Sequence, residues 1–116
     1  MSSPWWLPFG RVPEISAGEL NRMIQDGGAQ LIDVRTPVEF ATGHIAGACN
    51  VPIYTLKQAL PSLALDPNRP IVAICATAHR SPPAVRLLRA AGYKNAAQLK
   101  GGMLGWAAAR LPTTGA

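Results

Sequence analysis

The sequence is short of acidic residues, of cysteine and of long hydrophobic runs. Its 116 residues include 6 Asp and Glu against 11 Lys and Arg, so the formal net charge is +5. A positive surface favours anionic partners. However, no run of five or more Lys or Arg occurs, and basic residues become frequent only from Arg69 onward. A small anionic substrate accounts for this charge as well as nucleic acid does, and we expect no nucleic-acid partner.

The two cysteines, Cys49 and Cys75, are too few for a disulfide framework, and no CxxC or Cys/His metal spacing is present. We therefore expect no metal, no cofactor and a reducing cytoplasm in which both thiols stay free. No stretch approaches the roughly 20 apolar residues of a membrane span. Hydrophobic residues make up 48% of the chain and charged residues 15%, which fits one globular domain and excludes a disordered chain.

Residues 1–11 lack the basic and apolar regions of a signal peptide, but they contain Trp5, Trp6 and Phe9. We interpret this segment as an arm that packs over the domain. A dimer contact and a membrane-surface anchor are the alternatives, because exposed aromatic side chains mark interfaces. We expect a monomer or a weak homodimer, a domain over residues 12–111, and a loose tail over 112–116.

Short apolar runs alternate with segments of helical composition along the rest of the chain. Ser16 with Glu19, and Thr36 with Glu39, form capping boxes that start helices. The alternation predicts an α/β domain with a parallel sheet and helices on both faces. The expected strands are 31–34, 48–51, 71–74 and 97–99, and the expected helices are about 17–25, 37–42, 56–60, 82–91 and 103–110.

The segment from Cys75 to Arg80 joins the clearest strand to a helix. In such sheets ligands bind outside the carboxyl ends of the strands. Converging loop amides, the helix N-terminus and Arg80 each favour negative charge there, so they favour a thiolate over a thiol at Cys75. A thiolate is a nucleophile, and the same loop is suited to a small anion. The alternative is that Cys75 is a buried structural thiol.

Three blocks of the sequence resemble rhodanese-like domains. The run Cys75 to Arg80 is similar to their active-site loop, in which a Cys and an Arg bracket four residues. Residues 33–52 (with DVR, EF, GHIAGA and NVP) and residues 101–106 (GGM with Trp106) are similar to the family's first and closing stretches. The resemblance covers roughly residues 12–111. It implies a three-layer α/β/α fold with a central, mostly parallel five-stranded sheet.

The resemblance also implies a sulfurtransferase. Cys75 would take a sulfane sulfur from thiosulfate or a persulfide donor, hold it as a persulfide, and pass it to cyanide or a thiol, a protein thiol included. The main-chain amides of this loop would stabilise the persulfide anion. Arg80 would orient the loop or hold the anionic donor, and His79 would either help bind the donor or be an exposed loop histidine. The loop residues concerned are Ala76, Thr77, Ala78, His79 and Arg80.

Two departures from the family pattern concern the same loop. Ala78 stands where family loops often carry Gly, and Ala costs about 1 kcal/mol if the backbone there is left-handed. Residues 76–78 contain no Lys or Arg, whereas loops suited to thiosulfate are often more basic. A protein or small-molecule persulfide is therefore at least as plausible a donor as thiosulfate.

The remaining polar residues of the blocks are interpreted as scaffold. Asp33 and Arg35 are expected to pair and support the loop, with Glu39 nearby. His44 is expected to bond to backbone. Cys49 is expected to be a small buried hydrophobe, with a resolving thiol as the alternative.

The glycines at 101 and 102 are expected to make a turn and to let backbone approach the loop. Two other functions stay open. A phosphatase or arsenate reductase of the same fold is one, although such phosphatases carry a loop one residue longer. A non-catalytic binding module is the other, although such modules usually lack the cysteine.

Overall fold

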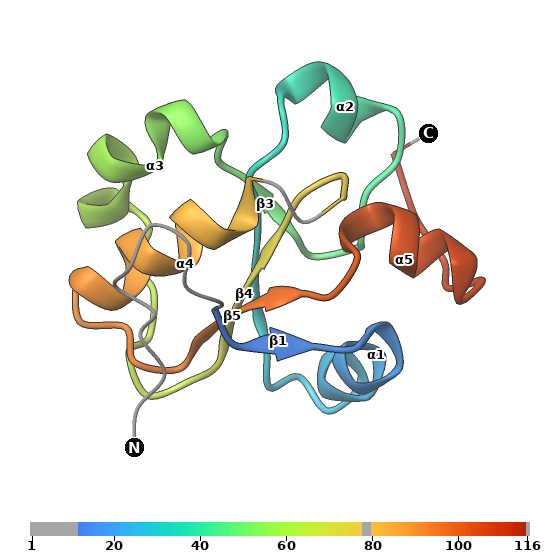
Figure 1. Ribbon diagram of the computed structural model, residues 1–116, viewed down its shortest axis with the longest axis horizontal. Coiled ribbons are helices and arrows are strands. Elements are labelled where there is room, and N and C mark those ends of the chain that lie inside the picture. Colours follow the sequence, from blue (N-terminus) through green and yellow to red (C-terminus); the bar gives the residue numbers. More distant parts are fainter. Residues whose placement is uncertain (1–11, 78–79, 116) are drawn as a thin grey trace.

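The computed structural model describes residues 12–77 and 80–115 and shows five strands in one sheet (Figure 1). The strands lie in the order β1-β5-β4-β2-β3, and every pairing between them is parallel. This confirms the predicted five-stranded parallel sheet. The strands are β1 (Glu14–Ile15), β2 (Gln30–Asp33), β3 (Cys49–Asn50), β4 (Ile71–Ile74) and β5 (Ala96–Leu99).

Helices cover both faces of the sheet, as predicted. In Figure 1, α1 and α5 lie on one side of it and α3 and α4 on the other. The buried side chains form two matching clusters, one that includes Leu20 and Trp106 and one that includes Leu56 and Leu88. The helices are α1 (Ala17–Gln25), α2 (Pro37–Ala41), α3 (Ile53–Ala59, extended by the 3-10 turn Leu60–Ser62), α4 (Ser81–Ala90) and α5 (Gly102–Ala108).

The two predicted capping boxes mark true helix starts. The Ser16 hydroxyl accepts a hydrogen bond from the Glu19 N–H. At Thr36 both reciprocal bonds form, because the Glu39 carboxylate also accepts from the Thr36 N–H at 2.9 Å. The cap fixes the chain's direction as it leaves β2 and brings Glu39 to the carboxyl end of the sheet.

Strand β4 lies in the middle of the sheet and is buried along its whole length. Side chains alternate between the two faces of a strand. Ile71 and Ala73 accordingly pack into the cluster of α3 and α4, whereas Val72 and Ile74 pack into the cluster of α1 and α5. Cys75, the next residue, lies on the α3 and α4 side.

Three expectations from the sequence need correction. Strand β1 was not predicted, because two residues are too few to show a periodic pattern. Helix α3 begins at Ile53, directly after Pro52, and not at about Leu56. The tail expected to be loose is tied to the domain within its described residues, 112–115, since Thr114 forms an antiparallel bridge with His44.

The indole of Trp106 contributes to the same anchoring of the chain's end. Its Nε1 donates to the Pro112 carbonyl oxygen at 2.9 Å. The predicted aromatic arm, with Trp5 and Trp6, lies outside the described residues, as do Ala78 and His79. Among the helices of the described ranges, none has the length and hydropathy needed to cross a membrane.

Candidate functional site

Cys75 follows the last residue of the central strand, at the edge where the carboxyl ends of the strands meet. It is only 1% exposed. Its surroundings are not wholly apolar, because its Sγ lies 3.5 Å from the Ser81 Oγ. A thiol in this place has a polar neighbour that a purely structural cysteine does not need.

The N-terminus of α5 holds the base of the loop. The N–H groups of Met103 and Leu104 donate to the carbonyl oxygens of Cys75 (2.7 Å) and Ala76 (3.0 Å). Gly102 makes this approach possible, since it has a φ of +58° and a Cβ there would overlap the Cys75 carbonyl oxygen. The expectation that a glycine here lets backbone approach the loop is confirmed for Gly102, whereas a Cβ at Gly101 would meet the backbone of Gly105.

Helix α4 begins one residue earlier than expected, at Ser81. Pro82 and Pro83 follow, and neither has an N–H. They remove two of the donors that a helix N-terminus normally offers to an anion. The partial positive charge of the helix remains, but the hydrogen-bond donors near Cys75 have to come from the loop, Ser81 and Arg80.

Three backbone N–H groups of this region find no acceptor within residues 12–77 or 80–115. They belong to Ala76 and Thr77, which follow Cys75, and to Arg80, which caps α4. The prediction that these amides face an anion remains a prediction, and its parts at Ala78 and His79 lie outside the described residues.

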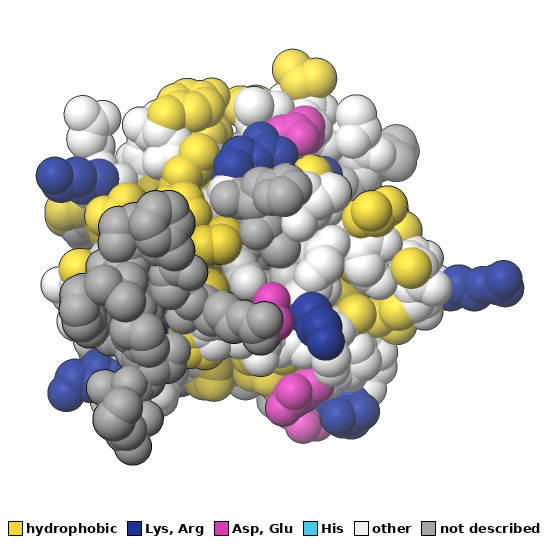
Figure 2. Space-filling view, viewed as in Figure 1, with side chains coloured by type: hydrophobic (Ala, Val, Ile, Leu, Met, Phe, Trp, Pro, Cys, Tyr) yellow, Lys and Arg dark blue, Asp and Glu magenta, His cyan; other side chains and the backbone are white. Residues whose placement is uncertain are grey.

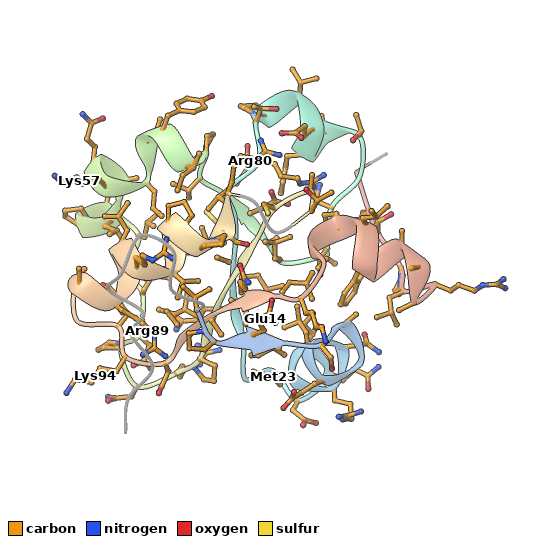
Figure 3. All side chains as sticks on the ribbon, viewed as in Figure 1. Glu14, Met23, Lys57, Arg80, Arg89 and Lys94 are labelled. Atoms are coloured by element: carbon orange, nitrogen blue, oxygen red, sulfur yellow. The ribbon has the colours of Figure 1, made fainter. Side chains whose placement is uncertain are left out.

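Arg80 is paired with Glu39 of α2, a contact that the sequence did not predict. Its two terminal nitrogens donate to the two Glu39 carboxylate oxygens at 2.7 and 2.9 Å. The Arg80 hydrogen bond is the main reason why the pKa of Glu39 falls to about 2, with the Thr36 N–H as the next cause. Figure 3 shows Arg80 between the start of α4 and α2. The pair therefore ties the far end of the loop to α2.

The pKa of Arg80 is raised above its ordinary value. The hydrogen bond to Glu39 is the largest cause, and charge interactions with Glu39, Cys75 and Asp33 add to it. Arg80 is therefore close enough to interact with a negative charge on Cys75. A guanidinium that already binds a carboxylate at both ends is better placed to orient the loop than to hold a second anion alone.

Asp33 and Arg35 form the scaffold pair that the sequence predicted, but in the interior. Asp33 is fully buried, and Arg35 Nε and one terminal nitrogen bond to its carboxylate at 2.8–3.1 Å. The same guanidinium donates to the carbonyl oxygens of Glu39 and Gly43. The pair thus fixes α2 and the segment after it against the end of β2.

Sequence reasoning missed a polar chain that starts at Cys75. The Ser81 hydroxyl donates to Gln98 Oε1 at 2.7 Å, and Gln98 Nε2 donates to Glu14 at 2.9 Å. Ser81 and Gln98 are both buried. A glutamine between the apolar residues Ala97 and Leu99 of a predicted strand is the signal that could have revealed it.

Two further expectations have different outcomes. His44 bonds to backbone as predicted, since its Nδ1 lies 2.9 Å from the Phe40 carbonyl oxygen, and its ring stacks on Phe40. The prediction that Cys49 is buried is wrong, because this cysteine is exposed on the two-residue edge strand β3. Its alternative role as a resolving thiol remains untested.

The surface charge is spread out on the face shown in Figure 2, where Lys and Arg side chains stand apart and form no continuous patch. Within the described ranges, no group of three or more His, Cys, Asp or Glu side chains is placed to hold a metal ion. The chemistry that this arrangement can support is therefore that of one buried sulfur, flanked by a hydroxyl and a cation.

Comparison with known proteins agrees with this architecture. The model of the rhodanese-like domain matches residues 16–109. The crystal structure of the rhodanese-related protein from Thermoplasma volcanium superposes with a TM-score of 0.80 at 30% identity, covering 90% of this chain and 99% of that one. The chain belongs to the rhodanese-like domain family.

Curated relatives differ in size and in name. A sulfurtransferase of Allochromatium vinosum is 32% identical over 102 residues, which are 87% of this chain and 94% of that protein. The HTH-type transcriptional regulator Rv0324 of Mycobacterium tuberculosis is 43% identical over 100 residues, which are 84% of this chain and 43% of the regulator. The chain spans 43–60% of the length of several curated relatives that it matches, so their activities do not transfer to it as a whole.

Proposed function

We propose that this protein is a sulfurtransferase that carries a sulfane sulfur on Cys75. The observation that carries the proposal is the position of Cys75. It directly follows the central strand, its carbonyl oxygen accepts from α5, the Ser81 hydroxyl lies beside its sulfur, and its charge interacts with that of Arg80. The name of the Allochromatium relative, which has nearly the same length, supports the same class of reaction.

The proposed reaction has two displacement steps. The Cys75 thiolate attacks the outer sulfur of thiosulfate, the S–S bond breaks, and sulfite leaves with the electron pair. With a persulfide donor, the leaving group is a thiolate instead. Cyanide or an acceptor thiolate then attacks the terminal sulfur of the Cys75 persulfide, which restores the Cys75 thiolate. Main-chain N–H groups of residues 76–80 would stabilise the anionic sulfur in both steps.

In this proposal Arg80 orients the loop through its ion pair with Glu39. The pair of Asp33 and Arg35 supports the loop by fixing α2, which carries Glu39, against the end of β2. No residue has to act as a general base if the thiolate is already formed. The partners are a small anionic sulfur donor and a thiol or cyanide acceptor, and the place of action is the cytoplasm, as the two free thiols suggest.

The test is the intact mass of the protein after incubation with thiosulfate or with a low-molecular-weight persulfide. We expect the added mass of one sulfur atom, removed by cyanide, in the wild type and in a Cys49→Ser variant. Cys75→Ser should fold and take up no sulfur, because a serine hydroxyl is a far weaker nucleophile at neutral pH. Sulfur uptake by Cys75→Ser, or none by the wild type with either donor, would contradict the proposal.

This mass measurement, together with an aryl phosphate hydrolysis assay, separates the two other functions. Release of phosphate from an aryl phosphate without sulfur loading would indicate a phosphatase. Absence of both activities would favour a binding module, a role compatible with the presence of related sequence inside a larger transcriptional regulator.

A further inference from the structure

A chain of polar side chains links Cys75 to the edge strand of the sheet. It runs from Cys75 Sγ to Ser81 Oγ (3.5 Å), to Gln98 (2.7 Å) and to the Glu14 carboxylate (2.9 Å). Gln98 pairs in register with Glu14, so the two side chains extend from neighbouring strands. Glu14, which Figure 3 labels on β1, is exposed, whereas the other three residues of this hydrogen-bond chain are buried.

The hydrogen-bonding capacity of each group sets the direction of this chain. An ionised carboxylate only accepts, so Glu14 requires the amide nitrogen of Gln98 on its side. The amide oxygen then faces Ser81 and takes the single hydroxyl proton of that serine. Ser81 is left with only lone pairs toward Cys75. The sulfur can then join the chain only as a donor, which means as a thiol.

We propose that Glu14 and Gln98 are positioning residues that set the hydrogen-bond direction of Ser81 and thereby control the ionisation of Cys75. With the chain directed toward Glu14, the thiol is favoured. A thiolate or persulfide anion at Cys75 instead needs the Ser81 hydroxyl as a donor. The hydroxyl reaches that state by rotating about its Cβ–Oγ bond away from Gln98. The S–H bond of the thiol breaks as its proton leaves to solvent, and the sulfur keeps the electron pair.

This rotation carries a cost that Glu14 imposes. Once Ser81 turns to the sulfur, the buried amide oxygen of Gln98 loses its donor, and an unpaired buried acceptor is unfavourable. Flipping the amide would bring its nitrogen to Ser81, but it would then set the amide oxygen against the Glu14 carboxylate, where two acceptors meet. A neutral donor at position 14 removes that conflict.

The other charged groups on the elements around Cys75 stay the same in the variants below. Arg80, at the start of α4, has a charge interaction with Cys75. It also binds Glu39 of α2 and interacts with the charge of Asp33 on β2. His79, in the same loop, lies outside the described residues. The groups to be held constant are Arg80, Glu39, Asp33, Arg35 and His79.

The experiment measures the pH midpoint of Cys75 ionisation in the full chain carrying Cys49→Ser, so that Cys75 is its only thiol. Thiolate ultraviolet absorbance is the primary readout, because it needs no access of a reagent to the buried sulfur. The rate of iodoacetamide alkylation against pH is the second. The variants are Gln98→Met, which keeps the net charge, Glu14→Gln, and the two combined. Gln98→Met and Glu14→Gln are each also combined with Ser81→Ala.

We expect Gln98→Met to lower the midpoint by about one pH unit, because Ser81 is then free to donate to the thiolate. Glu14→Gln should lower the midpoint as well. Its effect should be larger when residue 98 is Gln than when it is Met, since without the Gln98 amide only the loss of the Glu14 charge acts on Cys75. Neither substitution should shift the midpoint beyond that charge effect when residue 81 is Ala.

An unchanged midpoint in Gln98→Met, or an equal shift when Ser81 is Ala, would overturn the proposal. If Gln98→Met does not fold, the Glu14→Gln pair decides alone, because Glu14 is exposed and its substitution leaves the core intact. The inference rests on the proposed function only in taking Cys75 as the sulfur carrier. Sulfur loading is scored separately by mass, so a shifted midpoint in a protein that loads no sulfur refutes the function and not the control of ionisation.

Discussion

The ion pair between Glu39 and Arg80 gives the sharpest quantitative prediction, for the variant Glu39→Gln. Both carboxylate oxygens of Glu39 accept from Arg80, at 2.7 and 2.9 Å. Glutamine keeps the shape of the side chain and can still complete the capping box with Thr36, since Gln serves there as well as Glu. The substitution therefore removes the charge, and it replaces one of the two oxygens that accept from Arg80 by an NH2 group, which cannot accept.

The expected magnitude follows from the pKa of Glu39, which is lowered from 4.5 to about 2, chiefly by the Arg80 hydrogen bond. Between these values the unfolded chain binds more protons than the folded one. The stabilisation is therefore complete above about pH 4.5 and is lost as the pH falls through about 2. The side chains are 32% and 36% exposed, and solvent screening limits the pair to about 1 kcal/mol.

Thermal and urea unfolding of wild type and Glu39→Gln at pH 7 and pH 3 measure this effect. We expect Glu39→Gln to lose about 1 kcal/mol at pH 7, or about 4 °C in Tm. The difference from wild type should shrink to about half or less at pH 3. Glu19→Gln is the matched control, because Glu19 has the same third position in its helix and lacks an arginine partner among the described residues.

Two outcomes would refute the reasoning. If Glu39→Gln loses no more stability at pH 7 than Glu19→Gln, the ion pair contributes nothing beyond the helix-terminal charge that both glutamates supply. If the loss is real but independent of pH, its cause is packing or capping and not the ionisation of Glu39.

Two further substitutions test the supports of the loop. Gly102→Ala should lower the free energy of urea unfolding by about 3 kcal/mol or more, because a Cβ at this positive φ would overlap the Cys75 carbonyl oxygen. The control Gly18→Ala has open space around the new Cβ, so it should be neutral or stabilising by about 0.5 kcal/mol in the same assay. Asp33→Asn should cost about 3 kcal/mol by urea unfolding, since it leaves the buried Arg35 guanidinium without its counter-charge, and a loss below about 1 kcal/mol would show that the pair is not a support.

Local signals in the sequence predicted most of the fold correctly. The capping residues at 16 and 36, and the apolar run 71–74, depend on neighbours three or four residues away or on one strand's own pattern. The parallel order follows from the alternation of strands and helices. Strand β1 escaped prediction because its two residues gain their structure by pairing with β5, far along the chain.

The candidate site was predictable in its position and in the local pair of Asp33 and Arg35, but not in its long-range contacts. The end of β4 marks Cys75 by a general rule of parallel sheets. The pairing of Arg80 with Glu39 spans 41 residues, and that of Gln98 with Glu14 spans 84, so no local pattern encodes either. Cys49 was misplaced for a related reason, since a strand's composition does not reveal that it will lie at the edge of the sheet.

These long-range contacts bear on the choice of sulfur donor within the proposed function. Pro82 and Pro83 remove two N–H donors from the start of α4, and Glu39 occupies both ends of the Arg80 guanidinium. A dianion such as thiosulfate would have to compete with that carboxylate for the same cation, and it would approach a negative group in doing so. A thiol persulfide group carries a lower total charge than thiosulfate, and in the proposed function the loop amides would stabilise it. Within the proposed function, we therefore expect a persulfide to load Cys75 more readily than thiosulfate does.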